Sequence, residues 1–348
     1  MRKNSNNETE LPLTISSKDG LVDQVTFFNK KVSSKDMSGY YLLKNGEFAY
    51  NKIYSNGYDF GSIKRLERYE MGALSTLYIC FSLKKHCSDY IKHYFDSLKW
   101  YRQIYVISAE GARNHGLLNV PTDDFFATTH YLSPDIEEQK KIADFLSLVD
   151  QRIEKQRQLV ESLKKYKRGA LSRIFSNFEN WEKTEAKDIA TIETGCSNTQ
   201  DNNPNGLYPF YIRSANIARS DKYIFDGEAV LTIGDGQIGK IYHYINGKFD
   251  CHQRVYMITK FKKISGRYFY HFFSTFFYNR AIKMSAKNTV DSVRMDMIAK
   301  MPIYFPDKAK QKQIVSTLDT IDSFIDKQTK LLEQMTSLKK GFLQQMFI

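Results

Sequence analysis

One long segment occurs twice in the sequence, and this repeat decides the fold that we expect. The first copy, residues 138–175, reads EQKKIADFLSLVDQRIEKQRQLVESLKKYKRGALSRIF. The second copy, residues 310–347, reads KQKQIVSTLDTIDSFIDKQTKLLEQMTSLKKGFLQQMF. At an offset of 172 residues and without a gap, the two copies are identical at 14 of 38 positions. Chance does not produce a match of this kind, so the chain is internally duplicated.

Both copies have the period of a coiled-coil helix, because their apolar residues recur at alternating steps of four and three. Polar residues recur in this seam, Gln156 and Gln328 at one position and Lys167 and Lys339 at another. Such residues fix register and partner. The predicted seam and partner interface comprises Ile142, Leu146, Val149, Ile153, Gln156, Val160, Leu163, Ile314, Leu318, Ile321, Ile325, Gln328, Leu332 and Met335.

The length of each copy favours a rod over a core helix of a globular domain, which is the alternative. About 40 residues at ~1.5 Å per residue give ~60 Å, whereas a domain of ~130 residues has a radius of gyration of only ~14 Å. We therefore expect the two rods to pair with each other. The pattern does not show their relative direction, although pseudo-twofold symmetry between two linked domains would require them to be antiparallel.

The segments outside the rods are related more faintly. Asp124-x-x-Ala127 recurs as Asp296-x-x-Ala299 at the same offset, and Gly46-Glu47 resembles Gly227-Glu228 before an apolar strand. We expect a globular domain over 1–134, a helix over 135–176, a second domain over 177–306 and a second helix over 307–348. Pro134 and Pro306 are expected at the first helical positions.

A glycine-rich stretch, VLTIGDGQIGK (230–240), matches two phosphate-binding patterns, GxGxxG and GxxxxGK. Such loops are followed by a helix whose N-terminus binds the phosphate. Here the next residues, IYHYINGKF, are β-branched and aromatic and contain Asn246-Gly247, which predicts strand, turn and strand. We therefore interpret the stretch as a hairpin. A nucleotide-binding enzyme, or a tip that approaches nucleic acid, remains an alternative.

Charge and composition favour binding over catalysis. Lys and Arg (51) exceed Asp and Glu (39), for a net charge of +12, which favours a polyanionic partner. No apolar run reaches the ~18 residues of a membrane span, so we expect no membrane partner. The N-terminus has no secretory signal and the four cysteines form no CxxC pair, which indicates a cytoplasmic protein with reduced thiols. No pattern indicates a catalytic or metal site.

Loops rich in Arg, Lys, Asn and Gln are the segments expected to read nucleic acid, because these side chains bond base edges and phosphates. Residues 110–116, 211–219 and 285–289 have this composition, with residues 51–58 as a weaker fourth. The candidate DNA-binding residues are Lys52, Arg113, Asn114, His115, Arg213, Asn216, Arg219, Lys240, Lys287, Asn288 and Arg294.

The order of variable domain, rod, variable domain and rod resembles the specificity subunits of type I restriction–modification enzymes. The rods carry the resemblance, together with WEKTEAKDIATIETG (181–195), which is similar to the opening of a target-recognition domain, and GDGQIGK, which is similar to its glycine hairpin. The first half shows no counterpart of residues 181–195, which departs from the family pattern.

The resemblance implies an α+β fold with two target-recognition domains of mixed α/β structure, joined by an antiparallel coiled coil with pseudo-twofold symmetry. Each domain would read one half of a bipartite site on double-stranded DNA. The rods would set the spacing and dock methyltransferase (modification) subunits, joined by restriction/translocase subunits. The chain itself would hold no cofactor, because S-adenosylmethionine, ATP and Mg would be bound by the partner subunits. The alternative function is a coiled-coil scaffold that does not read DNA.

Overall fold

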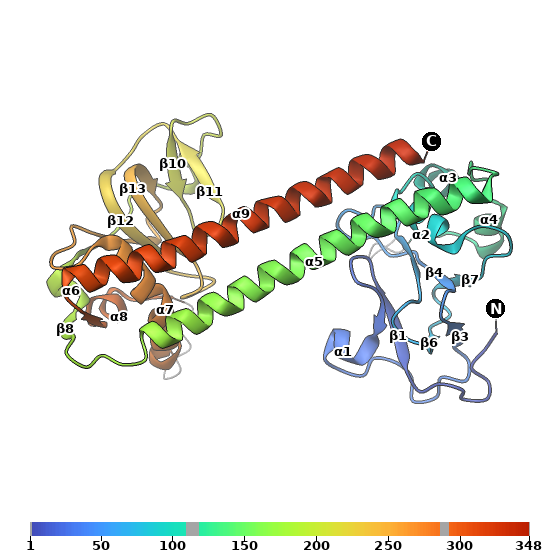
Figure 1. Cartoon of the computed structure of the whole chain (residues 1–348), viewed down its shortest axis with the longest axis horizontal. Helices are drawn as coiled ribbons and strands as arrows, with labels where there is room; N and C mark the ends of the chain where they lie inside the picture. The colour runs from blue at the N-terminus through green and yellow to red at the C-terminus, as the bar shows by residue number, and fades with distance from the viewer. Residues whose placement is uncertain (1, 109–117, 286–291, 348) are drawn as a thin grey trace. The chain divides into compact units, whose positions relative to one another are not determined.

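The computed structural model describes residues 2–108, 118–285 and 292–347. These residues form two compact units. Unit 1 contains residues 1–157 and 330–348, and unit 2 contains residues 158–329. Each unit therefore includes part of both long helices, α5 (Ile136–Ile174) and α9 (Lys308–Met346), which are drawn in green and red in Figure 1.

The two long helices begin in the same way, with an aspartate at the cap. The backbone N–H of Glu137 donates to the Asp135 carboxylate at 2.9 Å, and that of Lys310 donates to Asp307 at 2.9 Å. A carboxylate at this position satisfies N–H groups that have no partner within the helix. The expectation that Pro134 and Pro306 occupy the first helical position is therefore wrong, because each proline lies one residue before the aspartate.

Contacts within each unit show that the long helices run antiparallel. In unit 1 the rings of Phe145 and Phe342 lie 5.2 Å apart, and five residues further along α5 the carboxylate of Asp150 lies 2.5 Å from the Lys339 ammonium. Residue numbers along the contact therefore increase on α5 while they decrease on α9. In unit 2 Lys167 pairs with Asp322 at 2.5 Å. This is the same ion pair in the other copy, since both lysines and both aspartates are 172 residues apart.

The heptad residues lie on the inner faces of these helices, and none of them is exposed. Those that are buried are Leu146, Ile153, Val160, Ile314 and Leu318. Those that are half-buried are Ile142, Val149, Gln156, Leu163, Ile321, Ile325, Gln328, Leu332 and Met335.

Unit 2 is built on a mixed sheet in the order β11-β10-β13-β12-β14-β9. Its strands are β9 (Thr191–Thr194), β10 (Tyr208–Tyr211), β11 (Ile217–Ser220), β12 (Phe225–Ile233), β13 (Tyr242–Cys251) and β14 (Val255–Thr259). A smaller sheet pairs β8 (Glu182–Glu185) with β15 (Pro302–Phe305). The helices are α6 (Ala186–Ile189), η1 (Thr199–Asp201), α7 (Gly266–Ser285) and α8 (Met295–Ala299).

Helix α7 supplies most of the aromatic core of unit 2. Tyr268, Phe269, Phe272 and Phe273 are at most 2% exposed, so this part of α7 is buried in the core. Phe175, at the end of α5, packs against Phe272 with ring centroids 5.4 Å apart. Burying an aromatic side chain of this size contributes roughly 1.5–3 kcal/mol, so α7 anchors the long helices to the sheet.

Unit 1 has a sheet in the order β2-β1-β6-β3 and a second in the order β5-β4-β7. The strands are β1 (Pro12–Ser16), β2 (Gly20–Asp23), β3 (Tyr41–Lys44), β4 (Phe48–Asn51), β5 (Ser62–Arg65), β6 (Met71–Leu74) and β7 (Ile79–Phe81). The helices are α1 (Gln24–Phe28), α2 (Ser88–Asp96), α3 (Tyr101–Ile107) and α4 (Thr122–Ala127).

The two units share the pairing pattern of their central strands. Strand β4 pairs with β5 and β7 as β12 pairs with β13 and β14, and β1 runs parallel to β6 as β10 runs parallel to β13. The packing is also shared, because Phe347 packs on Tyr94 of α2 (5.6 Å) as Phe175 packs on Phe272 of α7. The faint repeat outside the rods is therefore a repeat of structure, and the predicted α+β fold class is confirmed.

Candidate nucleic-acid interface

The glycine-rich stretch ends β12 and forms the turn of the β12–β13 hairpin, as its sequence predicts. The turn predicted at Asn246-Gly247 is wrong, because β13 continues through these residues, which pair with Glu228 and Gly227. Thr232 pairs with Tyr242 on the opposite strand, and Lys240 precedes a strand, not a helix. Gly239 has φ +62°, and a Cβ there would lie 2.9 Å from the Cα of Tyr278, so no larger residue fits. The geometry does not provide the helix N-terminus that a phosphate-binding loop of this type uses.

The hairpin turn lies against two other segments of unit 2. The Asp235 carboxylate pairs with Arg213, from the loop after β10, at 3.2 Å. The carbonyl of Gly234 accepts from the backbone N–H of Val293, just before α8, at 2.6 Å. Three segments that are distant in sequence therefore meet at one place.

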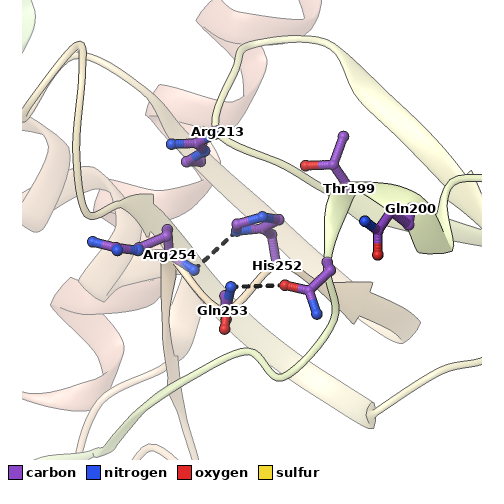
Figure 2. Close-up of a pocket in the computed structure, with 7 residues that line it drawn as sticks. Thr199, Gln200, Arg213, His252, Gln253 and Arg254 are labelled. Carbon is purple, nitrogen blue, oxygen red and sulfur yellow. Dashed lines mark hydrogen bonds between the residues drawn. The ribbon is translucent and has the colours of Figure 1, made fainter.

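An open polar pocket of about 510 Å³ lies next to this place and contains side chains from three segments of unit 2. Figure 2 shows Arg213, His252 and Arg254 grouped together, with Thr199 and Gln200 across from them. The pocket is lined by Asn198, Thr199, Gln200, Arg213, His252, Gln253 and Arg254.

A buried aspartate holds these segments together. Asp250, at the end of β13, is 0% exposed and accepts hydrogen bonds from the hydroxyls of Ser197 (2.7 Å) and Ser220 (2.8 Å). Its carboxylate also accepts from the backbone N–H of Cys251 at 2.8 Å. The segment entering the pocket at Asn198 is thus fixed to the strand that leads to His252.

The turn between β13 and β14 is held by its own polar groups. Nδ1 of His252 accepts from the backbone N–H of Arg254 at 3.0 Å, and the Gln253 amide donates to the Asn198 side chain at 2.7 Å. These bonds, drawn as dashed lines in Figure 2, set the direction in which the Arg254 side chain leaves the turn.

The electrostatics of the pocket favour an anionic partner. Both arginines are exposed, and the Arg254 guanidinium has no hydrogen bond or ion pair with any residue that the structure describes. Burial lowers the pKa of His252, and the charge of Arg213 lowers it further. His252 is therefore neutral near pH 7, while the arginines carry the positive charge. Arginine, glutamine and asparagine side chains are the groups that bond phosphates and base edges.

The predicted DNA-binding residues have several different environments. Arg213 lines the pocket, and Asn216 is exposed in the same loop. Lys240 is exposed on the hairpin with its ammonium 5.9 Å from the ring of Tyr278, and Arg294 is exposed beside Asp296.

Two predicted residues are engaged with the backbone, and five lie outside the described residues. The guanidinium of Arg219 donates to the carbonyls of Gly206 and Leu207, so it braces a loop. Half-buried Lys52, in unit 1, donates to the carbonyl of Val120 at 3.4 Å. The candidates that lie outside the described residues are Arg113, Asn114, His115, Lys287 and Asn288.

Six pocket residues were not expected from the sequence, namely Asn198, Thr199, Gln200, His252, Gln253 and Arg254. One signal was present, because Cys251-His252-Gln253-Arg254 interrupts two apolar strands with a polar run. The pattern alone does not distinguish such a run from an ordinary solvated turn.

A cluster of potential metal ligands, His271, Asp319 and Asp322, lies between α7 and the long helices. Arg267 pairs with Asp319 at 2.7 Å, and Lys167 pairs with Asp322 at 2.5 Å. Because both carboxylates are already neutralised by cationic side chains, we interpret the cluster as an ion-pair network that joins the helices.

In the described part of the chain, no helix is both long and apolar enough to cross a membrane.

Comparison with solved structures defines the class of fold. The chain superposes on the type I restriction–modification S subunit from M. genitalium with a TM-score of 0.60 and 12% identity, over 91% of this chain and 87% of that one. It superposes on a chain from a structure of the type I R-M system, described for its complex assembly and conformational transition, with a TM-score of 0.57 and 14% identity, over 99% of this chain and 93% of that one. The fold is that of type I S subunits.

Comparison of the sequence points to the same class of protein. Residues 178–337 match the family described as the type I restriction modification DNA specificity domain. The chain is also 26% identical, over 169 residues, to the type I restriction enzyme EcoDI specificity subunit of Escherichia coli. That match covers 47% of this chain and spans about a third (36%) of the length of the relative. The resemblance to specificity subunits is thus confirmed.

Proposed function

We propose that this chain is a non-catalytic, sequence-specific DNA-recognition subunit of a type I restriction–modification complex. The observation that carries the proposal is the open pocket of unit 2, in which Arg254 extends without a partner among the described residues. The net charge of +12 and the match of residues 178–337 to a DNA specificity domain family support it.

In this proposal the pocket residues divide between positioning and reading. Arg213 is held by Asp235 at the rim, which suits a contact to the phosphate backbone. Arg254 and Gln253 leave the same turn and suit bidentate contacts to guanine and adenine edges, each worth about 1–3 kcal/mol of discrimination. Thr199 and Gln200 lie across from them and would contact the same site.

The wider assembly is part of the same proposal. Unit 1 would read the other half of a bipartite site on double-stranded DNA, and α5 and α9 would set the distance between the halves. These helices would also dock methyltransferase subunits, which would bind S-adenosylmethionine, and restriction/translocase subunits that use ATP and Mg would join the complex. The complex would act in the cytoplasm.

DNA binding by the full chain, with purified methyltransferase subunits present, tests the proposal. Arg254→Ala should weaken binding to the cognate duplex and reduce the dependence of log affinity on log salt by about 0.9 if the side chain contacts a phosphate. If it reads a base, affinity should fall with little change in slope, and discrimination at one position should relax. Arg173→Ala, exposed on α5, is the control. Unchanged affinity and specificity in Arg254→Ala would contradict the role of the pocket.

Exchanging residues 177–306 for another recognition domain tests modularity. Only one half of the recognised sequence should change, as read from the methylation pattern of the host genome. A change in both halves, or in neither, would refute it. If no duplex DNA binds at low salt, with or without methyltransferase subunits, the coiled-coil scaffold becomes the better description.

A further inference from the structure

His252 is almost fully buried, yet it lines the open pocket of unit 2. It is 5% exposed, and its ring is grouped with Arg213 and Arg254 (Figure 2). Its backbone is held on both sides, because its N–H donates to the carbonyl of Tyr211 at 3.0 Å and its carbonyl accepts from the N–H of Val255 at 2.8 Å. The imidazole is therefore fixed in position and recessed behind the exposed arginine side chains.

One ring nitrogen of His252 has a partner, and this partner settles where the proton of the neutral ring lies. Nδ1 accepts from the backbone N–H of Arg254 at 3.0 Å, as the dashed line in Figure 2 shows. A backbone N–H can only donate, so Nδ1 carries no hydrogen and the proton of the neutral imidazole is on Nε2. His252 is therefore a hydrogen-bond donor at Nε2.

This Nε2 donor is unused within the part of the chain that the structure describes. No hydrogen bond to it occurs there. It is also not sealed from solvent, because it is absent from the buried polar atoms that lack a partner among the described residues. A donor whose direction is fixed and which opens into a pocket suits an acceptor that enters the pocket from outside.

The charges around the imidazole favour an anionic acceptor. The charged groups that face it are Arg213 from the loop after β10, Asp235 from the hairpin turn, and Arg254 from its own turn. Asp235 is already paired with Arg213 at 3.2 Å, and residues 197–200 supply only uncharged side chains. Phosphates protrude from a DNA duplex, whereas base edges lie within its grooves. A recessed donor beside two guanidinium groups therefore suits a phosphate oxygen.

We propose that His252 is a neutral phosphate-binding residue, which donates from Nε2 to a backbone phosphate of the DNA while its Nδ1 holds the turn that carries Arg254. This inference rests on the proposed DNA recognition by unit 2 and assigns one contact within it. Phosphate contacts fix register and orientation and carry no sequence information. His252 therefore anchors the duplex in the pocket and does not read its sequence.

The same geometry predicts that acid weakens DNA binding. Protonation places a hydrogen on Nδ1, so that two donors face each other across 3.0 Å and the turn at Arg254 has to rearrange. Burial, and then the charge of Arg213, lowers the pKa of His252, which keeps the ring neutral near pH 7. A histidine that bound phosphate as a cation would have the opposite effect, because its binding would strengthen in acid.

His252→Asn separates the two functions of the ring. The Asn Oδ1 replaces Nδ1 as the acceptor for the N–H two residues further on, whereas the shorter side chain has no donor at the position of Nε2. DNA binding is measured with the full chain and purified methyltransferase subunits. Near neutral pH the variant should bind about three- to tenfold more weakly. The loss should be equal for cognate and mismatched duplexes, and the salt dependence should not change, because the lost contact is neutral.

The pH dependence is the second measurement. From about pH 7.5 to about pH 5.5, the affinity of the unmodified chain should fall about two- to tenfold relative to that of His252→Asn. Hydrogen exchange at the Arg254 amide reports whether the variant retains the turn, and near neutral pH its protection should equal that of the unmodified chain. If the variant loses this protection, the sign of the pH dependence of the unmodified chain decides, because that measurement needs no substitution.

The outcomes separate this inference from the proposed function. If Arg254→Ala weakens DNA binding and His252→Asn does not, the role of His252 is overturned while recognition by the pocket stands. Binding by the unmodified chain that strengthens in acid would also overturn it, and so would relaxed discrimination at one base position in His252→Asn, because the acceptor would then be a base edge. Absence of DNA binding by the unmodified chain would overturn the proposed function itself, and the role of His252 with it.

Discussion

Replacing Asp250 by alanine tests whether a buried hydrogen-bond network builds the candidate interface. Its carboxylate accepts from three donors, at 2.7–2.8 Å, and the donors Ser197 and Ser220 are themselves at most 1% exposed. Asp250→Ala leaves these donors buried without their acceptor, at about 1–3 kcal/mol each. Because removing a buried carboxylate also removes its desolvation cost, we take the lower end and expect about 3 kcal/mol of lost stability.

The loss of stability should be confined to unit 2, and it should disturb the arrangement of the pocket residues. Ser197 precedes Asn198, and Asp250 precedes the turn that carries Gln253 and Arg254, so both sides of the pocket lose a common anchor. We expect DNA affinity to fall by about tenfold or more, which corresponds to 1.4 kcal/mol. Asp250→Asn keeps one acceptor oxygen and should have a smaller effect on both quantities.

Urea denaturation followed by hydrogen exchange measures each unit separately. Asp226→Ala is the matched control, because it removes the same charge from an exposed position on β12, the strand next to β13. If Asp250→Ala costs less than ~1 kcal/mol, or no more than Asp226→Ala, the network does not hold the pocket together and the reasoning is refuted.

Three further predictions concern the helices and their anchors. Ile153→Asp places a charge in the buried seam and should cost several kcal/mol in urea denaturation, whereas Leu148→Asp, exposed on the same helix, should cost little. Burial, and then the charge of Lys339, lowers the pKa of His93 to about 4. In the unfolded chain the His93 imidazole takes up its proton at a higher pH than in the folded chain. The free energy of unfolding of unit 1 should therefore fall by ~3 kcal/mol as the pH drops from 6.5 to about 4, and this fall should be absent in His93→Gln. Phe347→Ala should destabilise unit 1 by about 3–5 kcal/mol and leave unit 2 unchanged.

Much of the fold could be predicted because its signals are local. The heptad period of residues 138–175 and 310–347 reports which face of each helix is apolar, and a helix needs only its own backbone for its hydrogen bonds. The hairpin at 230–245 could also be predicted, because β-branched and aromatic residues after Lys240 favour a strand over a helix. The net charge is a sum over residues, so it also requires no structure.

The tertiary structure decided what depends on residues far apart in the chain. The pocket combines residues 198–200, 213 and 252–254, which are brought together by the pairing of β13 with β10 and by Asp250. Its composition is ordinary for a solvated surface, so no local pattern marks it. Arg219 shows the converse, since its sequence context suited base reading but its guanidinium is engaged with backbone carbonyls.

The sequence by itself determined the duplication, the two long helices and the basic character of the chain, because each is carried by periodicity or composition. The direction of the helices was decided only by contacts such as Lys339 with Asp150, since a heptad pattern is compatible with either direction.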